Sequence, residues 1–405
     1  MALISVADAL AHVLEGTTPL PPENAALNDA HGRVLAADVV ALRTQPPEDL
    51  SAMDGYAVRS ADVANVPVTL DVVGEVAAGH PFPGIIGKGQ AARIFTGGVV
   101  PPGADTIVIQ ENTKREASHV LVTTGSPPKK HIRRAGLDFE KDQVLLPRGR
   151  RLTERDLMLA AAMNHPVVPV HRRPRVAILA TGDELKPPGS TPGPGEIIYS
   201  NGFALAAMVR AEGAEVVDLG VVPDRIADTT AAIRRARSEH ADILLTSGGA
   251  SVGEYDLVQK ALTAEGLALS FWKIAMRPGK PLMSGKLGAM HVLGVPGNPV
   301  SAFVCAKMFL VPLIRRLAGR SDITPETESA VLGRDLPEND ERADYLRSNL
   351  VRPTDGPPVA TPFPTQDSSM IATLAKADCL VIRGPYAPAA KSGSRCVILR
   401  LKPFL

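Results

Sequence analysis

Residues 174–184, with the sequence PRVAILATGDE, decide the fold class of this 405-residue chain. Pro174 marks a boundary, the compact apolar run at 175–180 indicates a buried strand, and the polar residues after it indicate a loop. A helix closed by Gly213 is predicted at 201–212. A strand, a loop and a helix in this order are typical of a parallel α/β sheet.

The same alternation continues downstream and predicts an α/β domain over residues 174–319. We expect further strands at 215–220, 242–246 and 291–295, an extended segment at 269–275, and helices at 228–238, 255–264 and 299–317. This spacing calls for a doubly wound parallel sheet with right-handed crossovers.

The sequence on both sides of this domain has a different texture. Residues 45–144 place short β-type runs between glycine and proline clusters, which predicts a β-rich domain. Residues 1–44 and 145–173 are expected to form a discontinuous linking domain, with helix N-caps at Ser5 and Thr153. Residues 320–405 are predicted to form a small C-terminal β domain resembling a barrel. Several domains suit a chain longer than one hydrophobic core usually organises.

Composition excludes several classes of function. A formal net charge of +1 gives no global field for nucleic acid or an acidic membrane surface. Cys305, Cys379 and Cys396 are scattered and odd in number, so we interpret them as buried apolar residues in a reducing compartment. Neither a signal-peptide pattern nor a run of about 18 apolar residues is found, and we expect a cytoplasmic protein that does not enter a membrane.

Ligands of open α/β sheets bind beyond the carboxyl ends of the strands, so the loops at 181–184, 247–253 and 296–299 should meet at one site. The loop at 247–253, SGGASVG, combines hydroxyls with glycines that let backbone N–H groups form a nest for an anion. The alternative is an ordinary strand-to-helix turn. No Gly-Lys-Ser/Thr ending marks a Walker A loop.

Charged residues near these loops indicate a polyanionic ligand. Lys273, Arg277 and Lys280 lie within eight residues, and the alternative is a solvated basic loop. Carboxylates beside a phosphate site usually hold Mg²⁺, although a single aspartate in a loop is more often a turn or cap residue. The candidate carboxylates are Asp54, Asp138, Glu184, Asp224 and Asp256.

Six stretches, at 51–58, 94–102, 177–185, 247–253, 277–281 and 294–301, are similar in order to the signatures of the MoeA family of molybdopterin molybdenumtransferases, which includes the C-terminal domain of gephyrin-type proteins. The resemblance implies an elongated four-domain subunit and a homodimer, with the active site between the α/β domain of one subunit and the β-rich domain of the other. The catalytic residues it implies are Asp54, Thr96, Glu184, Asp256, Lys273 and Arg277. The predicted binding residues are Asp138, Asp224, Ser247, Gly248, Gly249, Ser251, Lys280, Pro296 and Pro299.

The reaction implied by the resemblance joins molybdate to molybdopterin-AMP, with Mg²⁺, and releases the molybdenum cofactor and AMP. Glu184 and Asp54 are the expected Mg²⁺ ligands. A molybdopterin adenylyltransferase would supply the substrate, and molybdoenzymes or their chaperones would receive the product. Two departures from the family pattern are Arg277, where lysine is frequent, and Asp142, where glycine is usual. The alternatives are a molybdopterin adenylyltransferase and a non-catalytic cofactor-binding scaffold.

Overall fold

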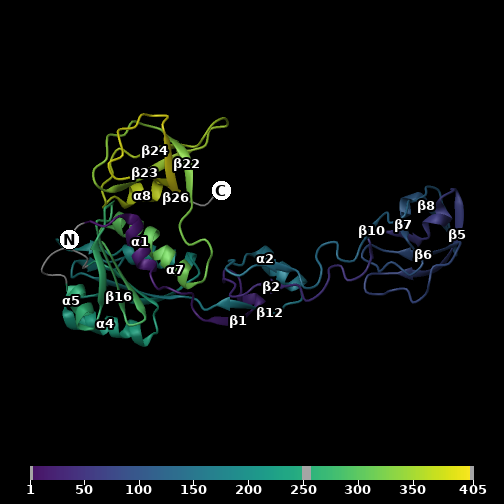
Figure 1. Ribbon diagram of the computed structural model, residues 1–405, viewed down its shortest axis with the longest axis horizontal. Coiled ribbons are helices and arrows are strands. Elements are labelled where there is room, and N and C mark those ends of the chain that lie inside the picture. Colours follow the sequence, from purple (N-terminus) through teal and green to yellow (C-terminus); the bar gives the residue numbers. More distant parts are fainter. Residues whose placement is uncertain (1–2, 249–256, 402–405) are drawn as a thin grey trace.

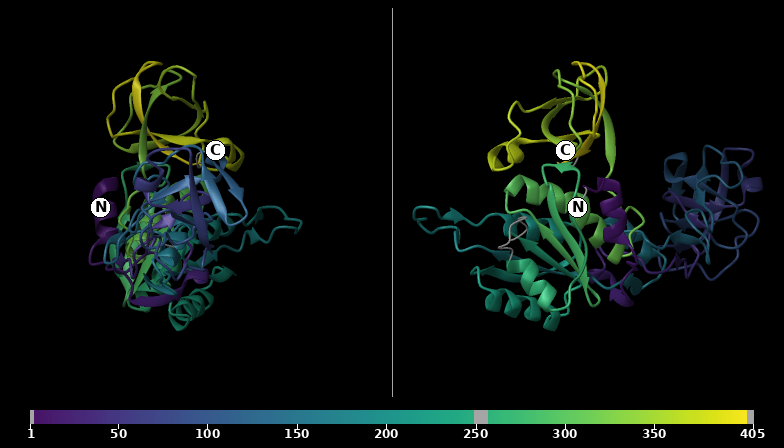
Figure 2. Two further views of the ribbon diagram at one scale, coloured as in Figure 1. Left: turned by 90° about the vertical axis from the view of Figure 1, so that its right-hand side faces the viewer. Right: turned by 60° about the vertical axis from the view of Figure 1, so that its left-hand side comes forward.

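The structure, a computed structural model, describes residues 3–248 and 257–401. The chain is elongated: the β-rich domain lies at one end, the linking domain lies in the middle, and the α/β domain with the C-terminal domain forms the other end (Figure 1). The right-hand view of Figure 2 again shows the β-rich domain apart from the α/β domain.

The α/β domain is built on a six-stranded sheet in the order β16-β13-β17-β21-β20-β18. Its strands are β13 (Arg175–Thr181), β16 (Glu215–Val222), β17 (Ile243–Ser247), β18 (Ala268–Lys273), β20 (Pro281–Leu287) and β21 (Met290–Val295). The pairings among β16, β13, β17 and β21 are parallel, as the sequence predicted. Strand β20 pairs antiparallel with both neighbours, because a tight turn at Gly288, with φ of 64°, reverses the chain before β21.

Helices cover both faces of this sheet, which explains the uninterrupted apolar run in β13. Ile178 belongs to the core cluster on one face and Leu179 to the cluster on the other, because successive strand residues point to opposite faces. One cluster contains residues of α1 (Val6–Leu14), α3 (Asn201–Ala211), α6 (Pro299–Cys305), the π-helical turn η4 (Ala306–Leu310) and α7 (Val311–Leu317). The other contains residues of α4 (Ile226–Ser238) and α5 (Leu257–Ala264).

The linking domain joins segments far apart in the sequence. Strand β1 (Pro22–Ala26) pairs with β12 (Val167–His171), and β2 (Val39–Val40) pairs with β11 (Val144–Leu146). Helix α2 (Glu154–Ala162) begins at the predicted cap Thr153, whose side chain and backbone are both engaged by Asp156. Asp142 adopts a φ of 69°, so this aspartate occupies a left-handed turn, as expected. The short 3₁₀ turn η1 (Leu27–Asp29) follows β1.

The β-rich domain carries a six-stranded sheet in the order β7-β4-β6-β5-β9-β8. Its strands are β4 (Gly55–Val58), β5 (Val68–Val76), β6 (Gln90–Ile94), β7 (Thr106–Ile109), β8 (Thr113–Glu116) and β9 (His119–Val122). Strand β3 (Leu50–Ser51) pairs with β10 (Ile132–Arg133) beside it, and the 3₁₀ turns are η2 (Ser60–Val63) and η3 (Gln110–Asn112).

The C-terminal domain is a closed barrel, because β23 pairs with both β24 and β25 and so completes the ring. Its strands are β22 (Thr327–Leu332), β23 (Ala343–Val351), β24 (Val359–Pro362), β25 (Cys379–Arg383) and β26 (Arg395–Arg400), with one helix, α8 (Ile371–Lys376). The two-residue strand β19 (Met276–Arg277) leaves the α/β domain and pairs with β23. Figure 1 shows the barrel stacked on the α/β domain.

A narrow arm projects from the α/β domain between β13 and α3. It contains the paired strands β14 (Leu185–Lys186) and β15 (Ile197–Ile198), and Figure 2 shows it extending away from the sheet. None of the helices within residues 3–248 and 257–401 is long and apolar enough to cross a membrane.

Candidate active site

A cavity of about 930 Å³ lies at the carboxyl edge of the α/β sheet, where the sequence predicted that the strand-end loops would meet. The loops that follow β13, β17 and β21 all line it. Of the predicted site residues, the cavity brings together Glu184, Asp224, Ser247, Gly248, Pro296 and Pro299. Gly249, Ser251 and Asp256 lie outside the described residues.

The acidic wall of the cavity comes from the loops after β13 and β16. Glu184 folds back over Gly182, where an added Cβ would lie 2.6 Å from the Glu184 Oε2 atom. The backbone N–H of Asp224 donates to Asp183 Oδ1 at 3.2 Å, which joins the two loops. Glycine at position 182 therefore lets the Glu184 carboxylate fold back onto the loop after β13.

The polar floor of the cavity lies at the end of β17. Ser247 is buried, and Gly248 has a φ of 92°. A Cβ on Gly248 would lie 2.8 Å from the carbonyl oxygen of Thr181, so a larger residue would push β13 and β17 apart. Glycine is required here both for the backbone conformation and for the close approach of the two strand ends.

Two predicted cations lie close to this cavity without lining it. Lys273 ends β18 and pairs in register with Pro281, which does line the cavity. The carbonyl oxygen of Lys280 accepts a hydrogen bond from the N–H of Ile274 at 3.0 Å, so both lysines lie at the same edge of the sheet. Within the described part of the chain, no salt bridge pairs either lysine with a carboxylate.

Arg277, a predicted catalytic residue, contacts two carboxylates of the C-terminal domain. Its Nε and Nη2 atoms each donate to the Asp344 carboxylate at 2.7 Å, and Nη1 donates to Asp340 at 3.1 Å. The hydrogen bond to Asp344 raises the pKa of Arg277. The planar fork of arginine suits this bidentate contact, which fastens β19 to the barrel. Arg277 thus joins two domains, and two carboxylates offset its charge.

Asp54 and Thr96 lie together in the β-rich domain. The backbone N–H and the hydroxyl of Thr96 both donate to Asp54 Oδ1 at 2.8 Å, and these bonds lower the pKa of Asp54. Asp138 is exposed, and its N–H donates to the carbonyl of Gln45 at 3.0 Å.

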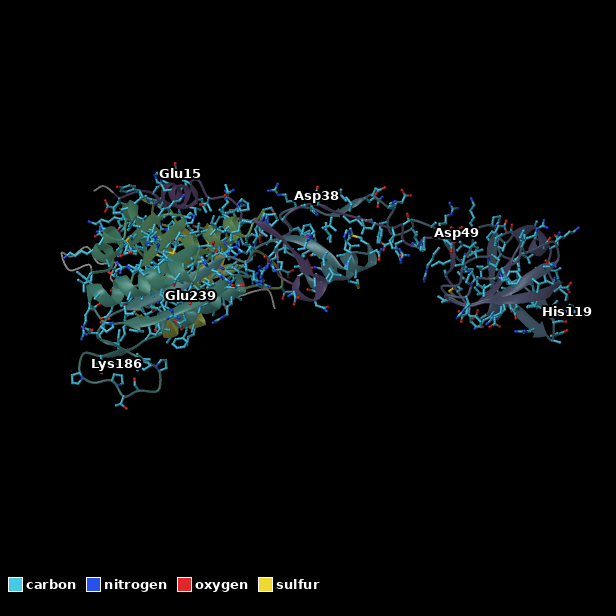
Figure 3. The ribbon with its side chains drawn as sticks, turned by 90° about the horizontal axis from the view of Figure 1, so that it is seen from below. Glu15, Asp38, Asp49, His119, Lys186 and Glu239 are labelled. Carbon is cyan, nitrogen blue, oxygen red and sulfur yellow. The ribbon has the colours of Figure 1, made fainter. Side chains whose placement is uncertain are left out.

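Within a single chain, Asp54 and Thr96 lie far from the cavity. Figure 3 labels Asp49, five residues before Asp54, at the opposite end of the molecule from Lys186, two residues after Glu184. The structure therefore does not bring Asp54, Thr96 and Asp138 to the cavity within one copy.

Several residues that line the cavity were not predicted from the sequence. Ser369 and Ile371 come from the C-terminal domain, and no pattern in the sequence places that domain beside the sheet. Tyr199, Ser200 and Asn201 also line the cavity. A polar residue opening a helix at the carboxyl edge of the sheet is a signal that could have identified Asn201.

The donor set of the cavity is oxygen-rich. Among residues 3–248 and 257–401, no group of three or more His, Cys, Asp or Glu side chains is arranged to hold a metal ion alone. Glu184 and Asp224 supply two carboxylates, and Thr181, Ser200, Ser247 and Ser369 supply hydroxyls. Such a set can share a hard cation with the phosphates of a ligand.

Three family models match the chain along nearly its whole length. The MoeA N-terminal region (domain I and II) matches residues 4–164, and the MoeA C-terminal region (domain IV) matches residues 329–400. Between them, a probable molybdopterin binding domain matches residues 177–316.

Similar proteins are known in bacteria and archaea. The molybdopterin molybdenumtransferase of Haemophilus influenzae is 36% identical over 368 residues, which cover 90% of each chain. That of Bacillus subtilis is 31% identical over 414 aligned residues, covering 96% of each chain. The crystal structure of a molybdopterin biosynthesis MoeA protein from Pyrococcus horikoshii superposes with a TM-score of 0.85 at 29% identity and covers all of both chains.

Proposed function

Because this chain belongs to the MoeA family of molybdopterin molybdenumtransferases, we propose that it inserts molybdenum from molybdate into adenylylated molybdopterin and releases AMP. The observation that carries the proposal is the cavity of about 930 Å³ at the carboxyl edge of the sheet. Its size suits a ligand with both a pterin and a nucleotide. The lining combines hydroxyls, amides and two carboxylates, which are groups that orient a polar, anionic ligand.

We assign the anionic groups of the substrates to the basic and hydroxyl residues at this edge. Ser247 and the backbone N–H of Gly248 bind a substrate phosphate, because hydroxyl and N–H donors suit phosphate oxygens. Lys273 and Lys280 attract molybdate and offset the negative charge that develops as the phosphoanhydride breaks. Arg277 fixes the position of the adjoining β19 segment, since its own charge is taken by Asp344 and Asp340.

The carboxylates fit a role in binding Mg²⁺. Glu184 and Asp224 offer the hard oxygen ligands that Mg²⁺ prefers, and phosphate oxygens of the substrate would complete its coordination. A Mg²⁺ ion held by these two carboxylates would supply positive charge beside the substrate phosphates. Glu184 and Asp224 then act by fixing the substrate phosphates relative to Lys273 and Lys280.

The second half of the site is proposed to come from another copy of the chain. Asp54 and Thr96 belong to the β-rich domain, which lies at the opposite end of the molecule from the α/β domain (Figure 1), so they reach a cavity only in a homodimer. Thr96 occupies Asp54 Oδ1 with two hydrogen bonds, which leaves Oδ2 for Mg²⁺ or for a water molecule. This arrangement keeps Asp54 ionised.

Reconstitution tests the proposal. Purified protein is mixed with adenylylated molybdopterin, Mg²⁺ and molybdate, and AMP release is measured alongside activation of an apo-molybdoenzyme. The expected result is AMP release that depends on molybdate and yields active enzyme. Activity that needs ATP and unmodified molybdopterin would indicate an adenylyltransferase instead. Binding of the adenylylated pterin without turnover would support a scaffold.

A further inference from the structure

Asn201, the first residue of α3, joins two of the loops that form the cavity. Its Nδ2 donates to Ser247 Oγ at 3.0 Å and to the carbonyl oxygen of Gly297 at 2.8 Å. Ser247 ends β17, and Gly297 follows β21, so one amide group spans the ends of two neighbouring strands. All three residues line the cavity.

The hydrogen-bond partners fix the polarity of this contact. A backbone carbonyl only accepts, so the atom of Asn201 that faces Gly297 must be the NH₂ group. The second hydrogen of that NH₂ group is then donated to Ser247 Oγ. Because the Ser247 oxygen accepts from Asn201, its own hydrogen is available to donate to a ligand in the cavity.

The amide is not needed to start its own helix. The Asn201 side chain makes bonds to Ser247 and Gly297, and no side chain caps the beginning of α3. The Tyr199 ring packs closely against the first turn of the helix, since a Cβ on Gly202 would lie 1.6 Å from the Tyr199 hydroxyl. The Tyr199 N–H also donates to the carbonyl of Lys186 at 2.8 Å, which anchors the approach to the helix. Truncating Asn201 therefore removes the loop contact while these anchors remain.

We propose that Asn201 is a positioning residue that acts through Ser247. It orients the Ser247 hydroxyl as a hydrogen-bond donor to a phosphate oxygen of the substrate, and it ties the loop after β21 to the end of β17 through Gly297. The inference rests on the proposed function, because it takes an anionic phosphate as the group that Ser247 meets. It adds a residue on α3 to the phosphate-binding residues proposed at the end of β17.

The test is a double-mutant cycle with Asn201→Ala, Ser247→Ala and the double variant. The dissociation constant of adenylylated molybdopterin is measured by calorimetry, and KM and kcat for AMP release are measured in parallel. Asn201→Ala should weaken binding and raise KM about 10-fold, the size expected for a hydrogen bond to a charged group. The double variant should lose clearly less binding than the sum of the two single losses, because Asn201 acts through Ser247.

Asn201→Asp sharpens the test, because it keeps the shape and reverses the polarity. A carboxylate accepts the Ser247 hydrogen, cannot donate to Gly297, and places negative charge beside the phosphate. Binding should therefore fall further than in Asn201→Ala, by about 100-fold. Asn24→Asp, an exposed position on β1, is the matched control and should bind as the wild type does.

The outcomes separate this inference from the proposed function. Additive losses in the cycle, or Asn201→Asp binding as well as Asn201→Ala, overturn the role through Ser247. A wild type that binds the adenylylated pterin without releasing AMP overturns only the proposed function, since the binding cycle still decides the inference. A wild type that does not bind it overturns both. Asn201→Ser repeats the cycle if thermal melting shows that Asn201→Ala is not folded.

Discussion

Thr96 donates both its backbone N–H and its hydroxyl to one oxygen of Asp54, each at 2.8 Å. The two bonds lower the pKa of Asp54, and both are made to Oδ1. An aspartate in a turn usually bonds to its own neighbouring backbone, whereas both donors to Asp54 come from Thr96, 42 residues away. This arrangement suits an aspartate whose carboxylate is oriented to bind a metal ion or substrate.

Thr96→Val should reduce activity while leaving the fold intact. The variant keeps the backbone donor but loses the hydroxyl, so the Asp54 carboxylate is held by one hydrogen bond. We expect kcat to fall about 10-fold, in line with the loss of a hydrogen bond to a charged group. Steady-state AMP release measures this. The control is Thr113→Val at the start of β8, which removes a hydroxyl that donates to the carbonyl of Gln110, and equal activity of Thr96→Val and wild type would contradict the prediction.

Mixing two inactive variants should restore activity if Asp54 serves the cavity of another copy. Asp54→Ala and Glu184→Gln are each expected to be inactive alone. After denaturation and co-refolding, mixed dimers would have one intact site, so about a quarter of all sites should be active. AMP release by the mixture is the measurement. If light scattering shows dimers but AMP release does not return, Asp54 and Glu184 do not act together in one shared site.

Lys280→Met should weaken molybdate binding without affecting stability. The Lys280 side chain is exposed, and its loss removes a positive charge from the edge of the cavity. We expect KM for molybdate to rise about 10-fold or more and the melting temperature to stay constant. Lys114→Met on β8 is the control, because it removes one charge from an exposed site in the β-rich domain. Unchanged KM in Lys280→Met would leave Lys273 as the anion-binding residue.

Arg277→Met should lower stability more than it affects the KM for molybdate. The substitution leaves the buried Asp344 carboxylate without its bidentate partner. We expect the free energy of unfolding to fall by about 2–4 kcal/mol. Arg277→Lys, the residue frequent in the family, should recover only part of this, because lysine lacks the planar fork. A large rise in the KM for molybdate with unchanged stability would indicate instead that Arg277 binds the anion.

Glu212→Gln should destabilise the protein in a pH-dependent manner. Burial raises the pKa of Glu212, but hydrogen bonds and charge from Arg315 and Arg320 outweigh this and lower it overall. A lowered folded-state pKa gives stability that is present above the usual glutamate range and is lost as pH falls through the lowered value. We therefore expect a loss of about 2–4 kcal/mol at pH 7 that shrinks in acid. Chemical unfolding at several pH values measures it, and a loss independent of pH would contradict the electrostatic explanation.

The sequence predicted elements best where burial leaves a strong pattern. Strand β13 lies between two layers of helices, so its apolar run identifies it directly. Strand β20 has a weaker pattern, PLMSGKL, because Gly285 lies too close to the Ala268 carbonyl for a Cβ. No local pattern could reveal it as a strand.

The site could be predicted only as far as local rules reach. The rule for strand-end loops placed Glu184 and Ser247 together. It could not anticipate that Asp344, 67 residues after Arg277, would occupy the guanidinium fork. The rule also could not predict that Ser369 lines the cavity, since this position depends on how the barrel stacks on the α/β domain.

Strand β19 has a consequence for how the molecule melts. Met276 and Arg277 pair in register with Ala343 and Asp344, so the backbone ladder of the barrel continues into the α/β domain. The Ala343 N–H donates to the Ala275 carbonyl at 2.9 Å and extends the same ladder. The barrel cannot swing away without breaking main-chain hydrogen bonds. In a calorimeter these two domains should unfold as a single cooperative unit, and the β-rich domain at the far end should give a transition of its own.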